Sequence, residues 1–100
     1  MLSTTRIRVS NHGLIRYKQR FNQKADINEI REKIRLCRPA GKQLKKLVLA
    51  KCRGHKKITS TSKLTILVND NGKEWEIFII RWTRRGECYL ITCFKENKKI

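Results

Sequence analysis

The sequence predicts an α+β fold in which two or three N-terminal helices pack on a three- to four-stranded antiparallel β-meander. Apolar residues recur at helical spacing in the first half of the chain, and from about Lys57 they alternate with a period of two. The 100 residues make one domain (1–100), and 39% hydrophobic residues suffice for a modest core. We expect residues 1–9 to form a basic N-terminal arm or short edge strand, and residues 95–100 a charged tail.

The first predicted helix begins near residue 10, where the side chain of Ser10 or Asn11 can cap it by accepting a backbone hydrogen bond. Leu14, Tyr17 and Phe21 follow at helical spacing, so we expect these three residues to face the core. Between them lies a second row of polar residues, which carries the functional prediction below.

The second predicted helix starts at Asp26, which with Glu29 forms a capping-box-like beginning. Pro39 and Gly41 are expected to stop it. Residues 42–52 fit either a short basic helix, which we favour, or a strand. The apolar stripe of the second helix recurs at helical spacing and consists of Ile27, Ile30, Ile34 and Cys37.

Strands are predicted for the second half of the chain. Asp70-Asn71-Gly72 is typical of a hairpin turn, because Asn and Gly accept positive φ, and Arg84-Arg85-Gly86 predicts a second turn. The helices are expected to cover one face of the sheet. An antiparallel sheet allows the other face to be open, but both faces carry apolar residues, so neither is plainly solvent-exposed. Trp75, Trp82 and Tyr89 are expected in the core, and an exposed one could stack on a base. The predicted strands are residues 58–60, 64–69, 74–83 and 87–94. On the third of them, Trp75, Ile77, Ile79 and Arg81 point one way and Glu76, Phe78, Ile80 and Trp82 the other.

The charge of the chain indicates the class of partner. Lys and Arg number 25 and Asp and Glu only 8, which gives a formal net charge of +17. Self-repulsion at this density opposes folding, so the excess indicates a polyanionic partner: nucleic acid, RNA in preference to DNA. No secretory signal and no apolar run of the roughly 18 residues that span a bilayer occurs. We therefore expect a cytoplasmic protein without a membrane partner.

Metal and cofactor sites are not predicted. No Cys-x-x-Cys pair occurs, and the absent secretory signal disfavours disulfides, so we expect buried free thiols. The eight acidic residues are scattered along the chain, whereas a metal-dependent nuclease needs clustered carboxylates. The four cysteines are Cys37, Cys52, Cys88 and Cys93.

His12, Arg16 and Arg20 lie four residues apart and form one row on the first predicted helix. Such a row suits metal-free RNA cleavage, because His transfers protons near neutral pH and Arg stabilises a charged phosphorane. Two plainer interpretations remain open. His12 can be a cap or a surface residue, and the arginines can form ion pairs with Glu29 or Glu32.

Other basic residues are candidates for contacting nucleic acid. They come from the first helix, from a basic loop in the middle of the chain, from the third predicted strand and from the second predicted turn. His55, in the basic loop, suits phosphate binding and catalysis equally, and simple exposure is the plainer interpretation. The full set is Lys18, Arg20, Arg53, His55, Lys56, Lys57, Arg81, Arg84 and Arg85.

A helical His12-x-x-x-Arg16-x-x-x-Arg20, an amphipathic helix and a meander ending in Leu90-Ile91-Thr92-Cys93-Phe94 occur in this order. This order resembles the small toxin-type ribonucleases of the barnase, EndoU, colicin D and RelE group. The resemblance implies that His12 is the acid/base residue, that Arg16 binds phosphate, and that Thr92 supplies a last-strand hydroxyl. The chain departs from the family at Gly13, where Ala is preferred, and at Phe94, where an aromatic hydroxyl is common.

Three functions follow as hypotheses. The first is a metal-independent endoribonuclease that cleaves RNA through the 2′-hydroxyl. The second is a nucleic-acid-binding module without catalysis, whose affinity would fall steeply with salt. The third is a protein-interaction factor, such as a phage-type inhibitor, whose basic surface docks on an acidic protein, an antitoxin or a host target.

Overall fold

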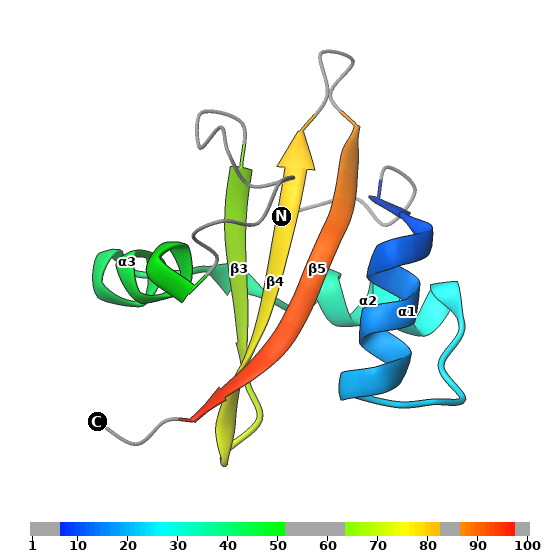
Figure 1. Cartoon of the computed structure of the whole chain (residues 1–100), viewed down its shortest axis with the longest axis horizontal. Helices are drawn as coiled ribbons and strands as arrows, with labels where there is room; N and C mark the ends of the chain where they lie inside the picture. The colour runs from blue at the N-terminus through cyan, green and yellow to red at the C-terminus, as the bar shows by residue number, and fades with distance from the viewer. Residues whose placement is uncertain (1–6, 52–63, 83–86, 98–100) are drawn as a thin grey trace.

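The computed structural model of the chain describes residues 7–51, 64–82 and 87–97. Over these residues the fold is α+β, as predicted, with three helices and one five-stranded sheet (Figure 1). The strand order across the sheet is β1-β5-β4-β3-β2. In chain order the elements are β1 (Ile7–Val9), α1 (Asn11–Arg20), α2 (Ile27–Arg35), β2 (Arg38–Pro39), α3 (Lys42–Lys51), β3 (Leu64–Asp70), β4 (Glu74–Trp82) and β5 (Cys88–Asn97).

The sheet is mixed, which corrects the prediction of three or four antiparallel strands. Strands β3, β4 and β5 form the expected antiparallel meander, but β1 joins β5 in parallel, with Ile7 opposite Cys88. At the other edge β2 pairs antiparallel with β3. These edge strands have three and two residues, which is too short for a period-two pattern. The strand expected at residues 58–60 lies outside the described residues.

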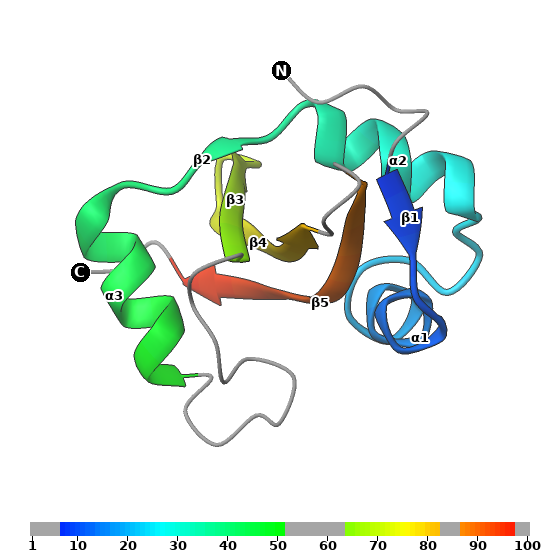
Figure 2. The ribbon, with the colours of Figure 1, turned by 90° about the horizontal axis from the view of Figure 1, so that it is seen from above.

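Helices cover both faces of the sheet, in keeping with the apolar residues that both faces carry (Figure 2). Two apolar clusters explain why both faces are buried. One, on what we call the α2 face, joins α1 and α2 to the sheet through Tyr17, Ile30, Ile34, Leu67, Phe78 and Ile80. The other, on what we call the α3 face, joins α3 to the sheet through Val48, Ile66, Val68, Ile77, Ile79 and Ile91.

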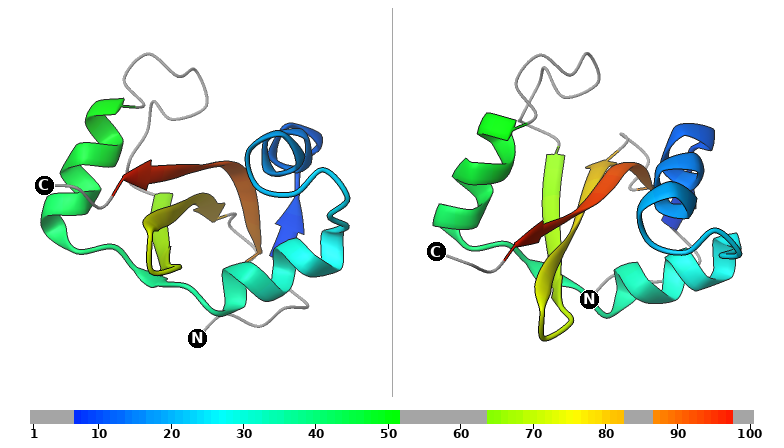
Figure 3. Two further views of the ribbon diagram at one scale, coloured as in Figure 1. Left: turned by 90° about the horizontal axis from the view of Figure 1, so that it is seen from below. Right: turned by 60° about the horizontal axis from the view of Figure 1, so that its bottom comes forward.

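Helix α3 confirms the helical interpretation of residues 42–51. Val48 is buried against the α3 face, and Leu44 packs on the same cluster one turn earlier. Figure 3 shows α3 on one side of the sheet and the α1 and α2 pair on the other. Strand β4 carries apolar side chains on both of its faces, so both faces of the sheet need to be buried. Different helices cover the two faces.

Helix α2 has the predicted cap, since the backbone N–H of Glu29 donates to Asp26 Oδ1 at 2.8 Å. Its apolar stripe is shorter than predicted. Ile30 and Ile34 are buried, but Ile27 is 40% exposed and Cys37 lies beyond the helix end at Arg35. The helix ends early because the chain turns into β2, which pairs with β3.

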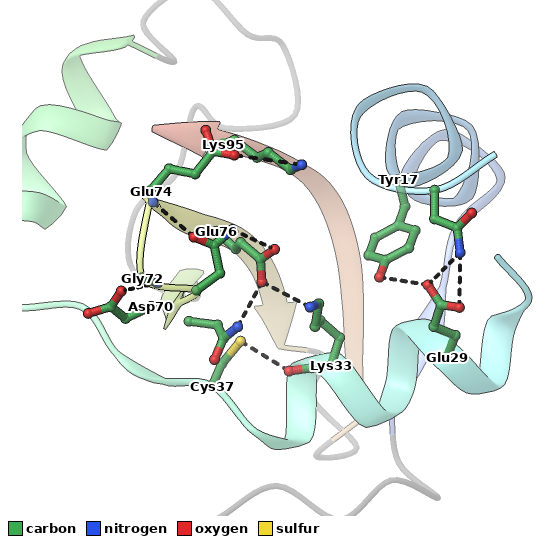
Figure 4. A network of polar contacts seen from close by, with 12 residues as sticks. Tyr17, Glu29, Lys33, Cys37, Asp70, Gly72, Glu74, Glu76 and Lys95 are labelled. Atoms are coloured by element: carbon green, nitrogen blue, oxygen red, sulfur yellow. Dashed lines mark hydrogen bonds and ion pairs between the residues drawn. The ribbon is translucent and has the colours of Figure 1, made fainter. Parts of the chain in front are cut away.

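The first hairpin turn is confirmed. Gly72 has a φ of 93°, which an L-residue with a side chain rarely adopts, and its N–H donates to Asp70 Oδ1 (Figure 4). Beyond the second hairpin, residues 95–97 continue β5 and are not part of a charged tail. They stay in the sheet because residues 74–76 of β4 pair with them, and Lys95 and Glu96 also form ion pairs with Glu74 and with Lys51 on α3.

Glu76 is a carboxylate inside the fold, only 4% exposed, beneath α2. It receives Asn69 Nδ2 at 2.7 Å, Lys33 Nζ at 3.1 Å and Asn71 Nδ2 at 3.3 Å (Figure 4). Burial alone would raise the pKa of Glu76, but these donors outweigh burial and lower it. The ionised carboxylate thus ties α2 to the β3–β4 hairpin.

A candidate nucleic-acid site beside strand β5

Helix α1 lies alongside the outer edge of β5, beyond the point where β1 ends (Figure 1). Ser10 caps the helix by accepting the N–H of Gly13 and donates its own hydroxyl to the Leu90 carbonyl, each at 2.9 Å. Further along, Arg20 Nη1 donates to the Cys93 carbonyl at 2.9 Å. These contacts occupy backbone carbonyls that an uncovered edge strand would expose.

Gly13 allows this close approach. A Cβ atom added at Gly13 would lie 2.6 Å from the Leu90 carbonyl oxygen, a distance that real Cβ atoms do not show. The departure from the Ala of the resembling family therefore has a structural reason in this chain. The backbone of α1 touches the strand directly at this position.

The apolar flank of α1 turns onto the α2 face of the sheet. The rings of Tyr17 and Phe21 stack with centroids 4.7 Å apart, and that of Phe21 lies 5.4 Å from Phe78. The Tyr17 hydroxyl donates to Glu29 Oε2 at 3.0 Å, which joins α1 to α2 (Figure 4). Burial and this carboxylate raise the pKa of Tyr17, so its phenol stays protonated.

The side chains of His12, Arg16 and Arg20, which we call the α1 row, lie on the flank of α1 across the edge of β5 from the apolar flank. An α-helix advances about 100° per residue. Tyr17 faces the α2 face, and the next positions around the helix, Gly13 and Arg20, contact the edge of β5. Arg16 and then His12 follow in the same direction of rotation. Their side chains therefore lie on the side of β5 away from the α2 face, which is the side of the α3 face.

His12 and Arg16 are in contact within this row. Arg16 Nε lies 3.5 Å from His12 Nε2, at the long limit of a hydrogen bond, and Arg16 Nη1 donates to Gln19 Oε1 at 3.1 Å. Arg20 donates to a backbone carbonyl, as described above. The polar contacts of Arg16 and Arg20 within the described part of the chain are thus to uncharged acceptors.

The carboxylates of the chain are engaged elsewhere. The predicted alternative, in which Arg16 or Arg20 pairs with Glu29 or Glu32, is not found, because Glu29 binds Tyr17 and Glu32 pairs with Arg35. The ion pairs among the described residues are Arg8–Glu87, Lys33–Glu76, Arg35–Glu32, Lys51–Glu96 and Lys95–Glu74. The positive charge of the α1 row is therefore not neutralised by these pairs.

Strand β5 contributes through a β-bulge. Ile79 on β4 faces Thr92, but the next residue, Ile80, faces Leu90, so Ile91 is an extra residue on β5. Thr92 consequently shares the α3 face with Ile79 and is 5% exposed. Tyr89 lies opposite Arg81, on the same face, and is partly exposed, while Arg81 is exposed.

We call this group of side chains on one side of β5 the α1–β5 site: His12, Arg16 and Arg20 from α1, Arg81 from β4, and Tyr89 and Thr92 from β5. Lys18 is exposed but lies on the flank of α1 beyond Tyr17, away from this group. The remaining residues predicted to contact nucleic acid lie outside the described residues: Arg53, His55, Lys56, Lys57, Arg84 and Arg85.

Tyr89 was predicted to be a core residue, with base stacking as the alternative for an exposed ring, and the structure shows it partly exposed. Strict alternation along β5 places Tyr89 and Thr92 on opposite faces, so the two could not be grouped from the pattern. Only the bulge at Ile91 brings them to one face. A signal in the sequence was the stretch Leu90-Ile91-Thr92-Cys93, which is apolar except for Thr92 and does not follow a simple period-two pattern.

Burial disfavours the thiolate form of the cysteines in the described residues. Cys37, Cys88 and Cys93 form no disulfide there. Burial raises the pKa of all three thiols, to about 12 for Cys37 and Cys93. Among residues 7–51, 64–82 and 87–97, no three His, Cys, Asp or Glu side chains cluster so as to hold a metal ion. No helix in the same ranges is long and apolar enough to cross a membrane.

Comparisons with protein-family models, with curated protein sequences and with solved structures found no match for this chain. Function is therefore inferred from the residues of the α1–β5 site and from their contacts.

Proposed function

We propose that this protein is a cytoplasmic, RNA-directed, metal-independent endoribonuclease whose substrate binds at the α1–β5 site. The observation that carries the proposal is the α1 row. Arg16 and Arg20 keep guanidiniums without carboxylate partners among the described residues, and Arg16 contacts the imidazole of His12. Phosphate oxygens are the ligands that such guanidiniums prefer, because they accept charge-assisted hydrogen bonds.

The chemistry would use the nucleophile that RNA itself carries. His12 Nε2, which accepts from Arg16 in the free protein, would take the proton of the 2′-hydroxyl. The 2′-oxygen then attacks phosphorus, the bond to the 5′-oxygen breaks, and a 2′,3′-cyclic phosphate forms. Arg16 and Arg20 would stabilise the charge on the phosphorane. The leaving 5′-oxygen would take its proton from a second acid or from water.

Thr92 has a different place in this proposal. Its side chain is 5% exposed, so it lies beneath the site and away from direct contact with substrate. The catalytic role that the resemblance implies for Thr92 stays a prediction. Burial of Thr92, together with Phe94 at the position of the family's aromatic hydroxyl, favours a second candidate: RNA binding at the same site without cleavage.

The deciding experiment incubates the full chain with 5′-labelled single-stranded RNA in the presence of a chelator. Cleavage that yields a 2′,3′-cyclic phosphate is expected, and His12→Gln should abolish cleavage while RNA still binds. Loss of cleavage on chelation would contradict the mechanism. Binding without any cleavage would establish the second candidate, and capture of one protein after nuclease treatment, without RNA binding, would favour a protein partner.

A charge-matched pair of variants locates the site. Arg16→Gln with Arg20→Gln removes two charges from the site, and Lys42→Gln with Lys46→Gln removes two exposed charges from α3. The first double variant should lower the slope of log affinity against log salt by about 1.4, since each phosphate contact on a single strand contributes about 0.7. Equal losses in both variants, at unchanged melting temperatures, would mean that binding is not localised at α1.

A further inference from the structure

Tyr89 is the one aromatic residue of the chain that belongs to neither apolar cluster. The sequence has seven aromatic residues, all within the described ranges. Six of them form part of a cluster or pack against one: Tyr17, Phe21, Trp75, Phe78, Trp82 and Phe94. Tyr89 is partly exposed and lies outside both clusters, so core packing does not account for its ring.

Tyr89 lies between two arginines. In the sheet register it faces Arg81 on β4 and Arg8 on β1, and residues directly opposite one another carry their side chains on the same face. Arg8 is paired with Glu87 at 2.6 Å, and its side chain is 58% exposed. Arg81 is exposed and forms none of the ion pairs found among the described residues. The ring thus has Arg81, which is outside those ion pairs, on one side and the Arg8–Glu87 pair on the other.

The row Arg8–Tyr89–Arg81 adjoins the first turn of α1. Residue 90, the next on β5, is the one whose carbonyl receives the Ser10 hydroxyl and against which Gly13 packs. His12 lies in this same turn, on the same side of the strand edge as the α3 face. A group that rests on the Tyr89 ring would therefore lie on the side of β5 that His12 also faces.

We propose that Tyr89 is a stacking platform for one unpaired nucleobase, with Arg81 holding an adjacent phosphate, so that the substrate is single-stranded RNA. This inference rests on the proposed function and adds the substrate class. Every base offers a π-face, and aromatic rings beside cations are the usual combination for binding single strands without sequence preference. A base inside a duplex is stacked on its neighbours and cannot lie on Tyr89.

The test measures binding of the full chain to three oligonucleotides by fluorescence anisotropy: a single-stranded RNA, the same strand with abasic nucleotides, and a duplex. The unmodified protein should bind the single strand most tightly. Tyr89→Leu should weaken binding to this strand about tenfold and leave binding to the abasic strand unchanged, whereas Tyr89→Phe, which keeps the ring, should bind like the parent.

Arg81→Gln provides the matched control, because it removes charge and not the ring. It should weaken binding to the base-containing and abasic strands alike. If the parent protein binds both single strands equally, or if Tyr89→Leu binds them as the parent does, stacking is wrong while RNA binding stands. If the parent protein binds none of the oligonucleotides, the proposed function and the stacking platform are both wrong.

Discussion

Tyr89 and Thr92 project from the same face of β5 although they are three residues apart in the sequence. Side chains alternate along a regular strand, so this pair would ordinarily lie on opposite faces. The extra residue Ile91, opposite the step from Ile79 to Ile80, reverses the alternation. The bulge places a partly exposed aromatic ring and a buried hydroxyl on the side of β5 that also carries His12 and Arg16. Bulges often re-aim side chains at functional sites in this way.

The first prediction concerns the contact between α1 and β5. Gly13→Ala should destabilise the protein by about 1–2 kcal/mol. Alanine favours a helix by about 1 kcal/mol over glycine. Against this, its Cβ would lie 2.6 Å from the Leu90 carbonyl oxygen. Because this is a backbone atom that cannot rotate away, the upper part of the overpacking range, about 2–3 kcal/mol, applies. Urea denaturation monitored by tryptophan fluorescence measures the change in the free energy of unfolding.

Gly41→Ala is the control for this prediction. No atom lies within 4 Å of a Cβ added at Gly41, and its φ is not in the positive region. We expect its free energy of unfolding to stay within about 0.5 kcal/mol of the parent. A Gly13→Ala protein as stable as the Gly41→Ala protein would show that α1 does not touch β5 as closely as described.

The second prediction concerns the buried carboxylate. Glu76→Gln should lower stability by about 1–3 kcal/mol at pH 7, because Lys33 would lose its partner in a buried pair. The pKa of Glu76 is lowered by folding, so its contribution is present above the ordinary carboxyl pKa of about 4.3 and is lost as the pH falls through the lowered value. The stability difference between parent and variant should therefore shrink below about pH 4.

Glu74→Gln serves as the comparison for Glu76→Gln. The Glu74 carboxylate lies 3.7 Å from Lys95, and both side chains are 35% exposed. A surface pair of this kind contributes less than about 1 kcal/mol. Thermal unfolding of the three proteins from pH 3 to pH 7 measures the difference. Parallel stability curves for parent and Glu76→Gln would contradict the role assigned to the buried carboxylate.

The sequence predicts those features of the fold that depend on local periodicity. The cap at Asp26, the turn at Gly72 and the antiparallel meander each follow from signals within a few residues. The parallel pairing of Ile7 with Cys88 does not, because it joins two ends of the chain and β1 is too short to show alternation. The apolar residues on both faces of β4 show that the α3 face needs to be covered, but the sequence does not show that α3 is the helix that covers it.

The candidate site is predictable only in part. The row of His12, Arg16 and Arg20 depends on helical spacing alone, and the helix bears it out. The absence of carboxylate partners for the arginines could not be foreseen, because the partners of Glu29 and Glu32 depend on tertiary contacts. Tyr89 was expected in the core, and its place on the same face as Thr92 could not be foreseen, because a single inserted residue on β5 brings the two to one face.

The third prediction concerns the thiols. Cys37, Cys88 and Cys93 should resist alkylation by iodoacetamide at pH 7.5 in the folded protein, because burial raises the pKa of each thiol and the thiolate is the reactive form. In denaturant all three should react quickly. Peptide mass spectrometry after timed quenching reports each residue separately. Rapid labelling of Cys93 without denaturant would mean that the α1 contact with β5 opens readily.

The fourth prediction tests whether the Thr92 hydroxyl takes part in cleavage or only lies beneath the site. Thr92→Val should leave RNA affinity within about twofold, and the cleavage rate within about threefold, because a side chain that is 5% exposed does not touch the substrate. Arg16→Gln, tested alongside, should lower both, since its guanidinium is one of the proposed phosphate ligands. Single-turnover cleavage and anisotropy measure the two quantities. A loss of cleavage above tenfold in Thr92→Val, at unchanged affinity and melting temperature, would instead assign the hydroxyl the catalytic role that the family resemblance implies.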